Sequence, residues 1–207
     1  MTYQDNQLGF DALLRETDTL NADQKFQRQV ASLPDTMSAG IAHCCDLIAQ
    51  HDAAVLAADV ETAFALKDEA HLLAIKLNGG SGILANEDAA GCVLAREAAA
   101  KGGDVPLWGQ SGVFKVTVTG LRTRIDLDGF FGIGGRFHFW SGFSIRAVDR
   151  YKPFFSGTGY RSFLGVHAEP APDVTPDLFV SRILESHAAQ HLKGRLLDIA
   201  PLSTRTG

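Results

Sequence analysis

The chain has 207 residues, of which 45% are hydrophobic and 21% are charged, and its formal net charge is −5. A chain of this length and composition can bury a hydrophobic core without disulfides or metals, which excludes an intrinsically disordered protein. It contains no run of about 18 apolar residues, the minimum for a transmembrane helix. Its first ten residues lack the basic and apolar regions of a secretory signal, and its three cysteines form no disulfide pattern. We therefore expect a cytoplasmic protein that does not enter a membrane.

Helical periodicity dominates the first half of the chain. Apolar residues recur about every 3.6 positions from Met37 onward, and Asp59 is a suitable N-cap for a following helix. That following helix is apolar on two sides, which is typical of a central helix in a bundle. The predicted helices cover residues 8–32 (with a break near 20–23), 37–55, 59–77 and 86–102.

The period changes from 3.6 to 2 after Pro106, which indicates β-strands. Turn signals at Asp128-Gly129 and at residues 132–135 separate the strands and favour an antiparallel meander with one apolar and one polar face. A linker at residues 170–176 precedes a last helix that ends before Gly194. The predicted strands cover residues 114–119, 121–127, 136–140 and 143–147, and the predicted last helix covers 177–192.

Charges and aromatic residues are unevenly distributed between these two parts. Residues 1–100 contain 6 Lys and Arg against 15 Asp and Glu, whereas residues 101–170 contain 9 against 5. Residues 101–170 also contain 13 of the 18 Phe, Tyr and Trp residues. The sequence thus predicts an α+β fold: a helical bundle or hairpin array at residues 1–104, packed with an antiparallel sheet closed by one helix at residues 105–207.

The polar face of the predicted sheet is the strongest candidate for a binding surface. Alternation places these side chains on that face: Lys115, Arg122, Arg124, Arg136, His138, Trp140 and Arg146. Burying unpaired guanidinium groups costs several kcal/mol, so the face must meet water, acidic groups or an anionic partner. Trp140 among cations is typical of surfaces that stack nucleic-acid bases, and the alternative is an acidic protein or the acidic helical half of this chain.

Two glycine-rich loops are weaker candidates for anion binding through backbone N–H groups. One covers residues 132–135 and is also explained by hairpin turns. The other, Ser156-Gly157-Thr158-Gly159, lies close to Arg161, which we include among the anion-binding candidates. A plain connecting loop explains the second segment as well.

His187 and His191 are four residues apart in the predicted last helix, a spacing that lets both imidazoles reach one metal ion. The zinc-protease motif His-Glu-x-x-His is incomplete, because Ala188 replaces its glutamate. His167 or Glu169 would have to complete a metal site. The alternative is that both histidines are partly buried where the helix packs. A second group, Glu61, Asp68 and His71, lies on one helix face and could contribute ligands to a bundle metal site. The alternative for this group is a solvated helix flank on which His71 is hydrogen-bonded locally.

No catalytic motif is complete. Asp68-Glu69-Ala70-His71 matches a helicase box, but the chain has no phosphate-binding loop, and Gly-x-Ser-x-Gly is absent. We predict no organic cofactor and favour a binding or adaptor protein over an enzyme. Its basic sheet face would engage an acidic protein or nucleic acid. A metal-dependent enzyme with a His187/His191 site is the alternative.

Overall fold

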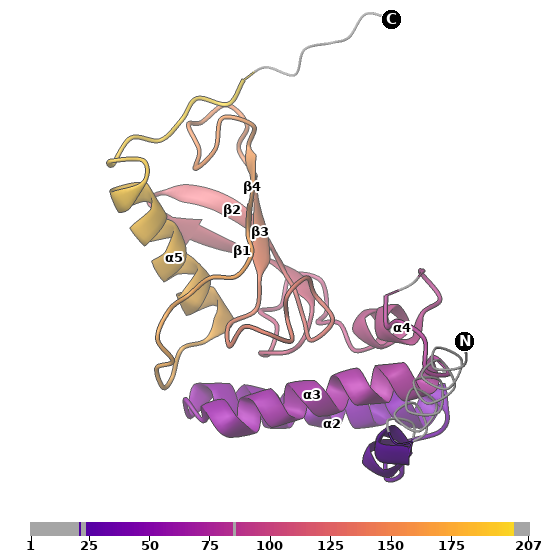
Figure 1. Ribbon diagram of the computed structural model, residues 1–207. Helices are drawn as coiled ribbons and strands as arrows, with labels where there is room; N and C mark the ends of the chain where they lie inside the picture. The colour runs from indigo at the N-terminus through magenta and orange to yellow at the C-terminus, as the bar shows by residue number, and fades with distance from the viewer. Residues whose placement is uncertain (1–20, 22–23, 85, 201–207) are drawn as a thin grey trace, which may run out of the picture.

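The computed structural model describes residues 21, 24–84 and 86–200, and it confirms the α+β class (Figure 1). Its elements in chain order are α2 (Met37–Leu56), α3 (Val60–Leu77), α4 (Ala90–Glu97), β1 (Gly112–Val118), β2 (Leu121–Leu127), β3 (Phe143–Ala147), β4 (Tyr160–Phe163) and α5 (Pro176–Gln190). None of the described helices is long and apolar enough to cross a membrane. The part of the predicted first helix that precedes residue 21 lies outside the described residues.

Helices α2 and α3 run side by side as a hairpin. Both begin where a side chain satisfies free backbone N–H groups. The Thr36 hydroxyl accepts from the Ala39 N–H at 3.4 Å, and the Asp59 carboxylate accepts from the Thr62 N–H at 3.1 Å. The sequence-based starts of these two helices are therefore confirmed. Helix α4 is shorter than predicted, covering eight residues.

The sheet is antiparallel, with strand order β1-β2-β3-β4. Thr119 and Gly120 connect β1 to β2, and both have positive φ angles, of 50° and 76°. A two-residue turn with two positive φ angles matches the twist of the flanking strands. Figure 1 shows α5 on one face of the sheet, and the side chains buried on that face include Phe114, Ile125 and Ile145.

One predicted strand is wrong and one observed strand was not predicted. Residues 128–142 form a long connection between β2 and β3 without strand structure, although residues 137–140 alternate in the sequence. Strand β4 has only four residues and follows the Ser156-Gly157-Thr158-Gly159 loop, where the sequence gives no strand signal. Short extended loops and short strands share the same alternation, so the pattern does not separate them.

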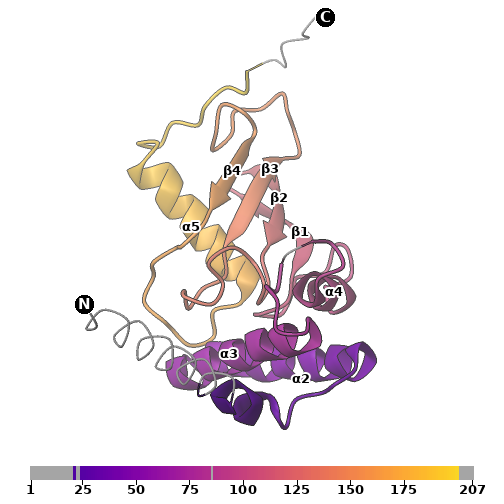
Figure 2. The same cartoon turned by 45° about the vertical axis from the view of Figure 1, so that its right-hand side comes forward.

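The helix hairpin lies beyond one end of the sheet and does not cover its open face (Figure 2). Residues of the 128–142 connection contact both parts. Trp108, Trp140 and Phe179 form an aromatic cluster in the hydrophobic core, with ring centroids 4.7 to 5.4 Å apart. Buried apolar residues form one cluster that includes helices, strands and connections. The division into subdomains 1–104 and 105–207 stays a prediction.

Candidate functional site

Three cations lie opposite one another on neighbouring strands of the open sheet face. Lys115 of β1 is paired with Arg124 of β2, and Arg124 is paired with Arg146 of β3. Adjacent strands are about 4.8 Å apart, so the three side chains emerge within about 10 Å across the sheet. All three residues are exposed. We call Lys115, Arg124 and Arg146 the cation row.

The period-two prediction for these strands is confirmed. Along β2, exposed Arg122, Arg124 and Asp126 alternate with buried neighbours. The buried set faces α5, and the cation row therefore points away from that helix. Since the exposed set is free of contact with the helix hairpin, the acidic helical half does not cover it within the described residues.

Electrostatic repulsion within the cation row destabilises the folded protein when no partner is bound. Like charges directly opposite on adjacent strands repel one another. Among the residues that the structure describes, none of the ion pairs includes a member of the cation row. The carboxylate of Asp126 is on the same face, two residues along β2 from Arg124. One carboxylate does not balance three cations, so this part of the face has an excess of positive charge.

Tyr160 extends the row on β4. It is paired with Arg146, whose guanidinium carbon is 4.8 Å from the tyrosine ring centroid. The Tyr160 hydroxyl is 2.7 Å from the Ser162 hydroxyl. The ring and the two hydroxyl groups add hydrogen-bonding capacity beside the cations.

We expect Arg124→Gln to raise the free energy of unfolding by about 0.2–1 kcal/mol, because it removes the central charge of a repulsive row. The gain should shrink in 1 M NaCl, where the screening length falls to about 3 Å. Chemical denaturation at low and high salt measures both values. A loss of stability at low salt would contradict the proposed repulsion.

Arg122 is on the same face but has a partner of its own. Its Nε and Nη2 donate to the Asp149 carboxylate at 3.2 and 2.5 Å. This hydrogen-bonded contact lowers the pKa of Asp149 and raises the pKa of Arg122. Arg122 is thus neutralised locally, unlike the cation row.

Three of the predicted surface residues are not on the sheet face, and this part of the prediction is wrong. Arg136, His138 and Trp140 lie in the connection between β2 and β3. Trp140 is only 2% exposed, stacks on Phe179, and donates its Nε1–H to the Ala168 carbonyl at 2.9 Å. Its large apolar ring is more favourable in the core than on the surface, so it provides no platform for nucleic-acid bases.

The other two residues of this group are separated from each other as well. The Arg136 Nε donates to the Asp68 carboxylate of α3 at 2.8 Å. The His138 ring packs edge-on against His167, with centroids 5.3 Å apart. Neither residue lies beside the cation row.

Arg161 is also outside the cation row. It is paired with Ile145 and therefore lies on the face that α5 covers, with its guanidinium carbon 5.4 Å from the Phe163 ring centroid. In the preceding loop the Ser156 hydroxyl accepts from the Thr158 N–H at 3.2 Å and lies 2.9 Å from the Thr158 hydroxyl. The two hydroxyl groups are satisfied within the loop, as in an ordinary turn.

His187 and His191 are close, with stacked ring centroids 5.1 Å apart. His187 is buried, and its Nε2 has no hydrogen-bond partner. Burial, then the charges of Arg161 and His191, lowers the pKa of His187. Within residues 21, 24–84 and 86–200, no three His, Cys, Asp or Glu side chains are grouped to hold a metal ion. Of the residues predicted for this metal site, His187 and His191 lie close together in the described part of the chain. His167 packs against His138 and does not complete the site.

The sequence pattern did not single out Lys67, a buried basic residue of the helix hairpin. Lys67 is 2% exposed, and its Nζ donates to the carbonyls of His138 and Phe139 at 2.6 and 3.0 Å. Burial lowers the pKa of Lys67 to about 8. His51 is fully buried beside Phe130, and neither ring nitrogen has a hydrogen-bond partner in the part of the chain that the structure describes. The i, i+4 spacing of Lys67 and His71 places both on one face of α3, but nothing local in the sequence marks that face as buried.

Comparison with known proteins gives two curated relatives, both named "Protein KlcB" and both from Escherichia coli. The first is 38% identical over 135 residues, which is 64% of this chain and 33% of the relative. The second is 34% identical over 175 residues, which is 82% of this chain and 36% of the relative. The chain therefore spans about a third of the length of these relatives. No protein-family model and no solved structure matches the chain.

Proposed function

We propose that this chain is part of a cytoplasmic binding protein that holds an acidic protein segment on the cation row. The single observation that supports the proposal is the opposed placement of Lys115, Arg124 and Arg146, which form no ion pair with a carboxylate of the described residues. A row of carboxylates would relieve the repulsion among the three cations, so binding energy is available at this surface. The three free cysteines fit a reducing compartment.

An acidic protein segment is favoured over nucleic acid for two reasons. Trp140 is in the core, and the remaining aromatic residue of the face, Tyr160, is covered on one side by Arg146. Nucleic-acid binding depends on many phosphate contacts, whereas the row offers three cations in a chain of net charge −5. A short acidic segment needs only a few carboxylates to match the row.

The test measures binding of a hexaglutamate peptide and of a twelve-nucleotide oligothymidylate to the same protein. We expect the wild-type chain to bind the peptide more tightly. The triple variant Lys115→Gln, Arg124→Gln, Arg146→Gln should lose at least about tenfold in peptide affinity, which corresponds to about 1.4 kcal/mol. The wild-type affinity should fall as salt rises, and the variant should show a smaller salt dependence.

A matched control removes three exposed cations elsewhere: Lys101→Gln, Arg150→Gln and Arg195→Gln. It changes the net charge by the same amount and should leave the peptide affinity within about twofold, because long-range attraction is screened beyond the Debye length. Equal losses in both variants would contradict a localised site. Tighter binding of the oligonucleotide through the same three residues would replace the acidic segment with nucleic acid.

A further inference from the structure

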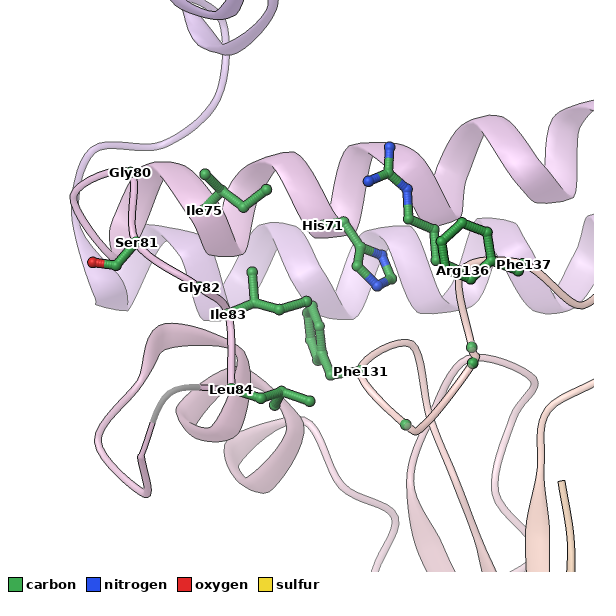
Figure 3. Close-up of a pocket in the computed structure, with 13 residues that line it drawn as sticks. His71, Ile75, Gly80, Ser81, Gly82, Ile83, Leu84, Phe131, Arg136 and Phe137 are labelled. Carbon is green, nitrogen blue, oxygen red and sulfur yellow. The ribbon is translucent and has the colours of Figure 1, made fainter.

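A hollow of about 420 Å³ lies between the helix hairpin and the connection that follows β2 (Figure 3), and no cation-row residue lines it. Its walls are the second half of α3, the 80–84 loop and the 131–137 segment. This volume falls in the range of small-molecule sites. Three glycines of the 131–137 segment, Gly132, Gly134 and Gly135, add no side chain to the wall, which keeps the space open.

Apolar side chains form much of this hollow. Ile75, Ile83 and the ring of Phe131 line it. Two large apolar side chains at its edge are exposed to solvent, Leu84 at 48% and Phe137 at 78%. Exposed side chains of this size next to a cavity are typical of a ligand site, where a bound molecule would cover them.

His71 contributes a hydrogen-bond acceptor to the same space. Its Nδ1 is 2.8 Å from the Lys67 carbonyl oxygen, so Nδ1 carries the proton of the neutral ring and Nε2 has the free lone pair. Burial lowers the pKa of His71, which keeps the ring neutral at pH 7. The ring also contacts Phe131, with centroids 5.6 Å apart.

Arg136 contributes a cation. The Asp68 carboxylate accepts from its Nε at 2.8 Å and fixes the orientation of the side chain. The terminal nitrogens of Arg136 have no hydrogen-bond acceptor in the described part of the chain, and the side chain is 45% exposed. Two free donors on a planar guanidinium match a carboxylate or sulfonate group.

We propose that this hollow binds a small aromatic anion that also has a hydrogen-bond donor. The anionic group pairs with the terminal nitrogens of Arg136. The aromatic body lies against Phe131 and Phe137, and the donor reaches Nε2 of His71. The site is separate from the cation row, and it stands whether or not an acidic segment binds there.

Two fluorescent probes that differ only in charge test the proposal. The first, 1-anilinonaphthalene-8-sulfonate, has an aromatic body, a sulfonate and an N–H donor. The second, N-phenyl-1-naphthylamine, lacks the sulfonate. We expect one molecule of the sulfonate to bind per chain, at least about tenfold more tightly than its neutral counterpart.

Single substitutions locate the binding of the sulfonate probe. Arg136→Gln should abolish the preference for the sulfonate over the neutral probe, and His71→Phe should weaken binding of both probes, because both have the N–H donor. Arg150→Gln removes an exposed arginine elsewhere and should change neither affinity. Thermal unfolding of each variant identifies a fold defect, and Arg136→Lys, which retains the charge, should recover part of the preference. Equal affinity for the two probes, or an unchanged preference in Arg136→Gln, would overturn the proposal.

Discussion

Replacing Lys67 with alanine is expected to lower the free energy of unfolding by about 3 kcal/mol at pH 7. Truncating a fully buried long side chain leaves a cavity, and truncations of this size cost about 2–5 kcal/mol. The carbonyls of His138 and Phe139 also lose their donor, at about 1–3 kcal/mol for each unsatisfied group. The substitution also removes the free-energy cost of burying the ammonium charge, which offsets part of this loss of stability.

Comparing Lys67→Met with Lys67→Ala distinguishes the effect of the ammonium charge from the effect of the side-chain volume. Methionine retains most of the apolar stem, so it should destabilise the protein by less than half as much as alanine at pH 7. The pKa of Lys67 is about 8 in the folded protein, below the ordinary lysine value of 10.5. Between these two values the unfolded chain binds more protons than the folded protein, so stability rises with pH.

The pH dependence gives the sharper measurement for Lys67. The wild-type protein should gain about 3 kcal/mol relative to Lys67→Met as the pH rises from 8 to 10.5, from a pKa difference of about 2.5 units. The comparison with the variant is needed because burial raises the pKa of Cys44 to about 12, which lowers stability with rising pH in both proteins. Urea unfolding at several pH values measures the difference. A constant difference across this range would contradict a buried, charged Lys67.

The sequence predicts the elements whose pattern has a local cause. Strands β1, β2 and β3 alternate because α5 covers one of their faces, and this is why the exposed positions of Lys115, Arg124 and Arg146 were predictable. The alignment of the three cations into one row needs more information. It depends on the two-residue turn at Thr119 and Gly120, which fixes the register of β1 against β2.

Tertiary contacts decide the features that the sequence did not predict. Residues 137–140 alternate as a strand would, but Trp140 is held by Trp108 and Phe179, which are distant in sequence. The same holds for Lys67, because within the described residues its Nζ donates only to carbonyls about 70 residues further along the chain. Local periodicity contains no information about such partners, so a buried lysine and a surface lysine have the same signature.

The hollow beside α3 combines both kinds of information. The glycines at residues 132–135 were recognised as a turn or an anion-binding loop from the sequence. The structure places this segment opposite His71 and Ile75 of α3, which no local pattern indicates. The candidate ligand site therefore depends on the 132–135 loop, which the sequence predicts, and on its contact with α3, which the sequence does not predict.

Acidification is expected to lower the free energy of unfolding substantially, because His51 is buried. Burial, and then the charge of Lys67, lowers the pKa of His51 to about 4, although the nearby backbone of Trp108 offsets a small part. The ordinary value is 6.5. Between pH 6.5 and 4 the unfolded chain binds the proton that the folded protein excludes, so stability falls as the pH falls. From pH 7 to 4, the loss attributable to His51 should be about 3 kcal/mol.

The variant His51→Leu isolates this contribution. It removes two buried nitrogen atoms that have no partner, and we expect it to match or exceed the wild-type stability at pH 7. It should then lose about 3 kcal/mol less than the wild-type protein on acidification to pH 4.

The positive charge of Lys67 also predicts an electrostatic coupling between Lys67 and His51. Lys67→Met removes the positive charge that disfavours protonation of His51, so the pKa of His51 should rise in that variant. The acid-dependent loss attributable to His51 should consequently be smaller in the Lys67→Met background than in the wild-type background. NMR titration of the His51 ring in both proteins measures the shift directly. An unchanged pKa would mean that the two groups do not interact and that burial alone accounts for the behaviour of His51.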